Sequence, residues 1–416
     1  MPSSFVVERG KTFCRGCNSE DLFSALDLGN LPIANELWSS PAEPVERFPL
    51  HLRICRTCGL GQVEDVVTPE RLFRDYRYLS SISTGFVEHA RIFAVETAQR
   101  LKLSPADLVV EIASNDGYLL NHFLDLGIAV LGIEPAENVA LLAIQKGVPT
   151  VSEFFGETLA RSLVDSYPTP KLIVANNVMA HVPDLQDFIS GLAVLAGPET
   201  FISIENPSLM NFIESDQFDT IYHEHYSYLT SHSVAQIAAN VGLRLIEVER
   251  IPTHGGSNRY WLQKISDAEG LKKSVLQEIE GELSSGLFDL DAWGAFSSRA
   301  NSTLTSFRDW LYETYKRGEN VYGYGAAAKA STLINAAGID TDWITGIADG
   351  SHEKQGRFMP INGIPIVSPE TLFAASPDHV IIFPWNIKEE LVKIIARGST
   401  KRIQIWNAIP IMTKIF

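Results

Sequence analysis

The chain has no apolar run near the ~18 residues that a membrane-spanning helix needs, and no cysteine after residue 58. Its start lacks a basic segment followed by a long apolar one, so we expect no signal peptide. Basic residues are also scarce: 34 lysines and arginines face 50 aspartates and glutamates, a formal charge of −16. Such a chain repels nucleic acid and anionic membranes, which disfavours a zinc-ribbon protein that binds nucleic acid. We expect a cytoplasmic protein with neither nucleic acid nor membrane as partner.

No internal repeat or low-complexity tract is present, and 416 residues at ~150 per domain predict two or three domains. Short apolar runs alternate with helical patterns over 108–205 and again over 320–406, which indicates parallel sheets with helices between the strands. We therefore predict an α/β fold. It comprises a small N-terminal zinc-binding module (1–75) and two doubly wound Rossmann-like domains (76–270 and 271–416).

The four cysteines form two Cys-x-x-Cys pairs, Cys14/Cys17 and Cys55/Cys58. Two thiolates three residues apart on a tight turn can chelate one ion, and a second such turn completes a tetrahedron. Four thiolates leave no open position, so we expect a structural zinc ion rather than a catalytic one. A redox dithiol and inert buried cysteines are the alternatives.

A buried strand runs into a turn of small and acidic residues at 109–117, Val-Val-Glu-Ile-Ala-Ser-Asn-Asp-Gly. In open α/β sheets the ligand binds beyond the carboxyl ends of the strands. Gly117 permits close approach to the backbone, and Glu111 and Asp116 add carboxylates. Glu134 ends the next predicted strand, where a carboxylate can accept both hydroxyls of a ribose. Because the turn is not Gly-x-Gly-x-x-Gly, we favour a cationic nucleoside such as S-adenosylmethionine, with an ordinary acidic turn as the alternative.

Two other segments carry groups that move protons. His181 lies just beyond a predicted strand end, where active sites gather, although it could equally be a structural cap of the following turn. The segment 219–228 is the densest in chemistry, since His225 can act as a general base, Glu224 can orient an imidazole, and Tyr222 can donate to an enolate oxygen. A polar aromatic loop and a His-x-His metal site are the alternatives for this segment.

A second glycine turn, Gly-Tyr-Gly-Ala-Ala-Ala-Lys at 323–329, opens a predicted helix, and Asp349 ends the next strand. The pattern fits a dinucleotide fingerprint, so an NAD-dependent oxidoreductase acting on a nucleotide-sugar is one reading. In another, the helix N-terminus and Lys329 hold the diphosphate of a nucleotide-sugar. Strand–helix packing without a ligand is the third. The glycine pair within 253–260 likewise suggests a phosphate site, a pocket cover or a plain β-turn.

Taken together, these residues resemble the S-adenosylmethionine-dependent sugar C-methyltransferases of antibiotic deoxysugar biosynthesis, a three-domain family. The match covers essentially the full length, and within the family the chain looks most like the C-3'-methyltransferase of tetronitrose biosynthesis. The motifs that carry the resemblance are the four cysteines, the segments 76–83, 110–117 and 176–184, Tyr-His-Glu-His-Tyr at 222–226, His-Gly-Gly-Ser at 254–257 and the turn 323–329.

The resemblance implies that the middle domain binds S-adenosylmethionine and that the C-terminal domain helps to bind a dTDP-linked keto amino sugar rather than NAD. It implies that His225 removes the C-3' proton with Tyr222 and Glu224 as partners, and that Tyr76 and His181 are further active-site groups. Residues implied for the cofactor are Glu111, Ala113, Asn115, Asp116, Gly117, Glu134 and Asn176; those for the sugar are Tyr78, Ser80, Ser81, His223, Arg259, Tyr324 and Lys329.

The implied substrate is a dTDP-3-amino-2,3,6-trideoxy-4-keto hexose. Its C-4' ketone makes the C-3' proton acidic, because the charge spreads onto oxygen. The site then needs a base over C-3', a donor at the ketone oxygen, expected to be Tyr222, and a methyl sulfonium in line. Ala113 stands where many relatives have glycine, which narrows the cofactor turn. The oligomeric state is left open, with a monomer among the possibilities.

Overall fold

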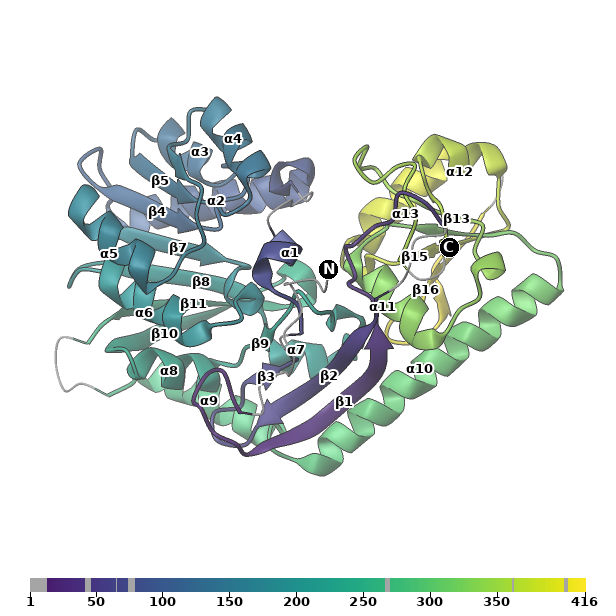
Figure 1. Cartoon of the computed structure of the whole chain (residues 1–416), viewed down its shortest axis with the longest axis horizontal. Coiled ribbons are helices and arrows are strands. Elements are labelled where there is room, and N and C mark those ends of the chain that lie inside the picture. Colours follow the sequence, from purple (N-terminus) through teal and green to yellow (C-terminus); the bar gives the residue numbers. More distant parts are fainter. Residues whose placement is uncertain are drawn as a thin grey trace, which may run out of the picture.

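The computed structural model describes residues 13–41, 46–64, 66–73, 79–265, 270–360, 363–399 and 403–416. Within them, no helix is both long and apolar enough to cross a bilayer. The chain forms two lobes (Figure 1): one holds the seven-stranded central sheet, and the other holds the six-stranded C-terminal sheet. The N-terminal strands lie at the base between the lobes, beside the long helix α10.

The N-terminal sheet contains four antiparallel strands in the order β1-β2-β3-β9. Its last strand is contributed by the middle of the chain, because β9 directly follows the histidine-rich segment 222–226 and pairs with β3. The zinc-binding module is therefore joined by strand pairing to the segment expected to do the chemistry. The elements are β1 (Leu22–Leu31), β2 (Phe48–Cys55), β3 (Gly61–Gln62), β9 (Ser227–Tyr228) and the short helix α1 (Pro69–Phe73).

The central sheet has the order β10-β11-β8-β7-β4-β5-β6, in which β6, β5, β4, β7 and β8 run parallel and β11 is antiparallel to both neighbours. The chain leaves β4 toward β5 and later returns to its other side as β7, so the carboxyl end of β4 is the switch point where such sheets bind ligands. The strands are β4 (Leu108–Ile112), β5 (Ala129–Ile133), β6 (Thr150–Val151), β7 (Leu172–Asn176), β8 (Phe201–Pro207), β10 (Leu243–Ile251) and β11 (Ser257–Lys264).

Both faces of this sheet are covered, which explains why β4 is a continuous apolar run apart from Glu111. Val109 packs with residues of α2 and α3, whereas Val110 on the opposite face packs with residues of α5 and α6. The helices of this lobe are α2 (Thr84–Leu101), α3 (Leu120–Asp125), α4 (Glu137–Gln145), α5 (Glu157–Ser166), α6 (Leu185–Leu195), α7 (Leu209–Glu214), α8 (Ser231–Ala239) and α9 (Lys273–Ser284).

The C-terminal sheet has the order β14-β13-β12-β15-β16-β17 and is parallel except for β17. Its strand order reverses at β12, so the second glycine turn also lies at a switch point. The elements are α10 (Leu290–Lys316), β12 (Val321–Tyr324), α11 (Ala328–Ala337), β13 (Gly346–Ala348), β14 (Ile366–Val367), α12 (Pro369–Ala375), β15 (His379–Ile382), α13 (Lys388–Gly398), β16 (Gln404–Asn407) and β17 (Thr413–Lys414).

The predicted α/β class, with a cysteine-bearing N-terminal module and two doubly wound sheets, is confirmed. One apolar core nevertheless runs through both the N-terminal module and the C-terminal domain, by way of α10. Phe23 of β1, for example, meets Trp293 of α10 edge to face at 6.3 Å between ring centroids. The predicted limits of the three domains, 1–75, 76–270 and 271–416, remain predictions.

Candidate active site

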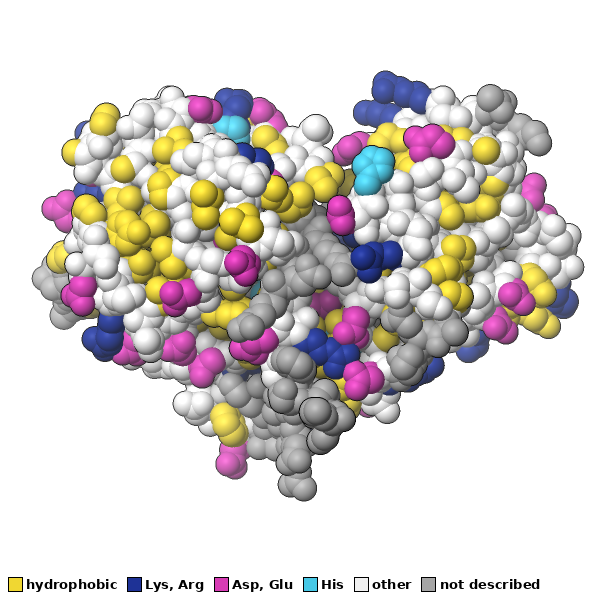
Figure 2. Space-filling view, turned by 45° about the horizontal axis from the view of Figure 1, so that its top comes forward, with side chains coloured by type: hydrophobic (Ala, Val, Ile, Leu, Met, Phe, Trp, Pro, Cys, Tyr) yellow, Lys and Arg dark blue, Asp and Glu magenta, His cyan; other side chains and the backbone are white. Residues whose placement is uncertain are grey.

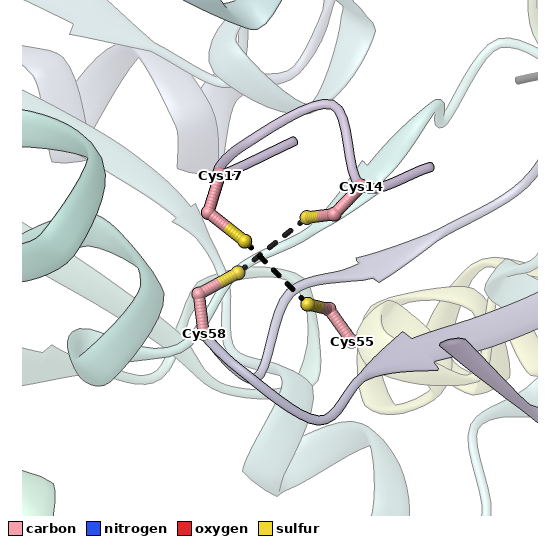
Figure 3. Close-up of side chains that lie close together, drawn as sticks. All are labelled: Cys14, Cys17, Cys55 and Cys58. Atoms are coloured by element: carbon pink, nitrogen blue, oxygen red, sulfur yellow. Dashed lines mark hydrogen bonds between the residues drawn. The ribbon is translucent and has the colours of Figure 1, made fainter. Parts of the chain in front are cut away.

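The four cysteine sulfurs lie within 4.8 Å of one another (Figure 3). The Sγ atoms of Cys14 and Cys58 are 3.5 Å apart, and those of Cys17 and Cys55 are 3.6 Å apart. A disulfide needs ~2.05 Å, whereas Zn–S bonds of ~2.3 Å in a tetrahedron place the sulfurs about 3.8 Å apart. The four thiols therefore fit a zinc ion, and the prediction of a metal site is supported by their geometry.

Arg15, between the first two cysteines, connects their turn to other parts of the molecule. It is buried, with 2% of its surface exposed. Its guanidinium donates to the carbonyl of Val63 at 2.5 Å and to that of Pro183 at 3.5 Å, and lies 5.3 Å from the ring centre of Tyr226. Pro183 follows His181 by two residues, and Tyr226 follows His225 directly. The zinc turn thus contacts both segments that carry the candidate imidazoles.

The turn after β4 is built from left-handed residues at the switch point of the sheet. Ala113, Asn115 and Gly117 have φ values of +57°, +49° and +77°. Glycine takes this conformation freely, but alanine does so at a cost of about 1 kcal/mol. A Cβ on Gly117 would also lie 2.8 Å from the side chain of Val148. The turn therefore exposes its backbone where a ligand is expected, at the carboxyl end of β4.

Carboxylates surround this turn. Burial, together with the charges of Glu134 and Asp116, raises the pKa of Glu111 well above its ordinary value. Burial also raises the pKa of Glu134, although its oxygens accept the amide hydrogens of Asn115 at 3.0 Å and Ala136 at 2.9 Å. A bound cation would stabilise the ionised form of these buried carboxyls. S-adenosylmethionine carries positive charge on its sulfonium and its ammonium group. Around this turn, four buried oxygens have no partner among the described residues: Glu111 Oε2, Ser114 Oγ, Asp116 Oδ1 and Asn176 Oδ1.

Ser80 and Ser81, predicted to bind the sugar, lie against the cofactor turn. The amide of Ser80 donates to Oδ1 of Asn115 at 2.9 Å, and the hydroxyl of Ser81 donates to the carboxylate of Asp116. Lys146 donates to the same carboxylate at 2.7 Å. These contacts fix the turn, and the ribose-facing role predicted for Glu134 stays a prediction. The predicted residues Tyr76 and Tyr78 lie outside the described residues.

His181 and His225 come together as a pair, with ring centroids 4.8 Å apart. Nδ1 of His225 lies 3.0 Å from the carbonyl of Thr220, and Nδ1 of His181 lies 2.7 Å from the carbonyl of Glu224. A carbonyl only accepts, so both Nδ1 atoms carry the proton and both Nε2 atoms are bare. Burial lowers the pKa of His181 to about 4 and that of His225 well below its ordinary value. The hydroxyl of Tyr222 donates to Nε2 of His225 at 2.7 Å.

The N-terminal module contacts His223 and Glu224, the two residues that precede His225. Glu224 is 3% exposed, and its Oε1 accepts from both the backbone amide of Asn35, at 3.1 Å, and its side chain, at 3.0 Å. Oε2 of Glu224 is buried without a partner in the described part of the chain. His223 points away, since its Nε2 faces the carbonyls of Phe48 at 3.3 Å and Pro49 at 3.2 Å. Asn35 and Glu224 are 189 residues apart in the chain, and no sequence pattern predicts their contact.

Arg259, another predicted sugar ligand, is enclosed within the middle domain. Its guanidinium pairs with Glu205 at 2.8 Å and with Glu249 at 3.1 Å, and it lies 4.4 Å from the ring centre of Phe93. His89 also contacts Glu205 at 3.0 Å. In this arrangement Arg259 neutralises two carboxylates at the end of the sheet, and its predicted contact with the sugar is untested.

Both glycines of the second turn are required for packing. A Cβ on Gly323 would lie 2.5 Å from the ring of Phe383, and one on Gly325 would lie 2.3 Å from Pro384. Asp349 accepts the amide of Ala326 at 2.8 Å, inside the turn. The third reading of this fingerprint, strand–helix packing, thus accounts for the glycines. The predicted ligand Tyr324 lies in the core of this sheet, among residues of α12 and α13.

Lys329 lies where the two lobes meet, and Figure 2 shows the surface hollowed between them. Its Nζ donates to Asn386 at 2.7 Å and lies 4.1 Å from the ring centre of Trp385. The indole of Trp385 in turn donates to Asp219 at 2.8 Å. Burial lowers the pKa of Lys329 to about 8, against the opposing effect of Asp219, and burial raises the pKa of Asp219 to about 6. Lys329 therefore carries a positive charge at neutral pH.

Three consecutive segments of the chain match known protein families. Residues 14–73 match the putative zinc binding domain of the methyltransferases, 87–248 a methyltransferase domain, and 252–410 the C-methyltransferase C-terminal domain. The chain is 30% identical to the C-methyltransferase NovU of Streptomyces niveus over 381 residues, which are 91% of each chain. These matches do not support the NAD-dependent alternative.

Two solved methyltransferase structures each match less than half of the chain. Magnesium protoporphyrin IX methyltransferase from Synechocystis is 16% identical, covers 43% of this chain and 78% of its own, and has a TM-score of 0.32. The CcbJ methyltransferase from Streptomyces caelestis is 12% identical over 42% of this chain and 90% of its own, with a TM-score of 0.33. Scores this low add nothing to the assignment.

Proposed function

Because the chain belongs to the S-adenosylmethionine-dependent sugar C-methyltransferases, we propose that it methylates C-3' of a dTDP-3-amino-2,3,6-trideoxy-4-keto hexose for an antibiotic deoxysugar. The enzyme uses S-adenosylmethionine, which supplies a methyl group on a positively charged sulfur, and it has a structural zinc site. The observation that carries the proposal is the pair of neutral imidazoles His181 and His225, each with Nε2 unprotonated. We assign the activity to the cytoplasm, where thiols stay reduced for zinc.

The proton at C-3' goes to Nε2 of His225. Nδ1 of this ring is held by the carbonyl of Thr220, so the ring is oriented and the bare nitrogen is the one that can accept. Tyr222 must first turn its hydroxyl away from that nitrogen. The freed hydroxyl can then donate to the C-4' oxygen, on which negative charge develops as the C–H bond breaks. One movement of Tyr222 thus prepares both the base and the oxygen.

Substrate recognition follows from the other groups. The unpartnered Oε2 of Glu224 can accept from the 3-amino group, which is adjacent to the reacting carbon. Lys329, positively charged at neutral pH and standing between the lobes, suits the diphosphate. The four unpartnered oxygens around the β4 turn suit the cationic cofactor. The remaining predicted contacts, those of Tyr76, Tyr78, Arg259 and Tyr324 with the sugar, belong to this proposal on the resemblance alone.

The deciding experiment supplies methyl-labelled S-adenosylmethionine and a panel of dTDP-4-keto sugars with and without a 3-amino group. Both C-3' and C-5' flank the ketone, so NMR of the product must locate the label. We expect the label at C-3' of the amino sugar. Label at C-5', or no transfer to any keto sugar, would contradict the proposed substrate.

His225→Asn should abolish methyl transfer while cofactor binding, measured by calorimetry, stays intact. His352→Asn is the matched control, since His352 is an exposed histidine on a loop of the other lobe. Wild-type turnover by His225→Asn would remove its role as the base.

A further inference from the structure

His254 is an imidazole that the proposed mechanism leaves unused, and its backbone is strained. It lies in the turn between β10 and β11 with a φ of +54°, a left-handed value that a non-glycine residue adopts at a cost. The turn is held on both sides: Thr253 donates to Glu205 at 3.1 Å, and Gln217 donates to the carbonyl of Gly255 at 2.8 Å. Strain maintained in this way is typical of functional residues.

The two glycines after His254 let the turn fit between the lobes. A Cβ on Gly255 would lie 2.4 Å from the indole of Trp385, and one on Gly256 would lie 2.4 Å from the side chain of Asn211. Trp385 is also the ring beneath Lys329. The backbone next to His254 therefore packs against Trp385, the same ring that Lys329 contacts.

The ring of His254 is linked by contact to the cofactor turn and by its electrostatics to the imidazole pair. It meets Phe86 edge to face at 5.6 Å, and Phe86 stacks at 5.2 Å on Tyr118, the residue after Gly117. Burial is the main cause that lowers its pKa to about 4, followed by the charge of Lys329 and, more weakly, that of His181. The ring is thus neutral at pH 7 and keeps one N–H. No hydrogen bond from this ring exists among the residues that the structure describes.

The chemistry needs such an N–H. An enolate oxygen accepts two hydrogen bonds, and Tyr222 supplies one only after it leaves His225. His181 and His225 spend their N–H groups on backbone carbonyls. A neutral imidazole is a good donor to a developing enolate, because it stabilises the charge without protonating the oxygen.

We propose that His254 is a catalytic residue that donates its N–H to the C-4' oxygen of the keto sugar. This inference rests on the proposed function. As the C-3'–H bond breaks, its proton passes to Nε2 of His225 and its electron pair moves onto the C-4' oxygen, which His254 and Tyr222 hold. No other reactant enters this step, so it can be followed without methyl transfer.

The test measures that step alone. The substrate carries deuterium at C-3', the enzyme is loaded with S-adenosylhomocysteine, and loss of deuterium to water is followed by NMR. His254→Gly relieves the strained φ while removing the imidazole, and should slow both deuterium loss and methyl transfer by about 10²-fold or more, with little change in KM. His254→Asn, which tolerates a left-handed φ and keeps an N–H donor, should recover part of both rates.

Ser376→Gly is the matched control, since Ser376 also has a left-handed φ, +45°, but caps α12 far along the chain. Wild-type deuterium loss in His254→Gly, or a raised KM with unchanged kcat, overturns the role of His254 and leaves the proposed function standing. A wild-type enzyme that neither releases C-3' deuterium nor methylates the amino sugar overturns both. If His254→Gly fails to fold, the rates of His254→Asn decide.

Discussion

The hydroxyl of Tyr222 lies 2.7 Å from Nε2 of His225, on the one nitrogen of that ring able to take a proton. In the proposed mechanism the two residues act as a unit, because the hydroxyl of Tyr222 occupies the base until a substrate displaces it. In that mechanism the base and the oxygen donor are in direct contact before the substrate binds.

Tyr222→Phe uncaps the base but removes a donor to the enolate oxygen. We expect kcat to fall by about 10²-fold with little change in KM for the sugar. Steady-state kinetics of Tyr222→Phe and the wild type checks this. A wild-type kcat in Tyr222→Phe would remove its role as a donor.

Asn35→Ala should change the pH profile. Burial raises the pKa of Glu224, and the two donors of Asn35 partly offset this rise. Removing the side-chain donor raises that pKa further, so the carboxylate form, present above the pKa, is lost at a higher pH. We expect the acid limb of kcat/KM to move upward, with a drop of about tenfold on that limb. Asn30→Ala, at the exposed end of β1, is the control; an unmoved limb would separate Asn35 from catalysis.

Lys329 should confer an alkaline limb on sugar binding. Its pKa is lowered to about 8 by burial, so the positive charge is present below that pH and disappears as the pH rises through it. We expect kcat/KM for the nucleotide-sugar to fall by about tenfold per pH unit above 8. In Lys329→Arg the charge persists, because arginine does not titrate in this range, and the limb should vanish. A limb that survives in Lys329→Arg would belong to another group.

Ala113→Gly should stabilise the protein. Alanine at a φ of +57° costs about 1 kcal/mol, and glycine removes that cost. Urea unfolding should therefore show a free energy of unfolding raised by about that amount. Ala98→Gly, in the right-handed helix α2, serves as the opposite control and should lower it by about 1 kcal/mol. Equal effects of the two changes would refute the strain at Ala113.

Cys58→Ser should lower zinc content below one ion per chain and the free energy of unfolding by roughly 4 kcal/mol. Its second effect is local. Hydrogen exchange should rise over 222–228, because Arg15 and β3 join the zinc turn to this segment, while 108–134 stays protected. Thr57→Ala, exposed in the same turn, is the control. Uniform exchange across both segments would argue against a local link.

Regular elements could be predicted where periodicity was strong. The strands at 108–112, 129–133 and 172–176 are apolar runs with helices between them, and they form as expected. The strands β1, β2 and β10 were not anticipated, since their side chains alternate between buried and exposed positions without a long apolar run. The short β9 could not be found from sequence, because its only support is pairing with β3, more than 160 residues earlier in the chain.

The candidate site divides in the same way. Residues inside compact motifs, such as Tyr222 and His225, were found from their chemistry. His223 has the same chemistry, yet its ring faces the N-terminal module at Phe48. Asn35 carried no signal, since its partner is Glu224 in a distant segment. The local sequence identifies the chemical groups that are available, but only packing determines the direction in which each side chain points.

What the sequence by itself determined is the inventory: an α/β chain, four thiols spaced for one metal ion, two turns at strand ends and a segment rich in bases. Each of these depends on contacts within a few residues, which the order of amino acids dictates directly. Tertiary structure alone decided which nitrogen of each imidazole is bare, which oxygens lack partners, and that the zinc module contacts the segment 222–228. Those features depend on hydrogen bonds between segments far apart in the chain, and such bonds form only when the domains pack.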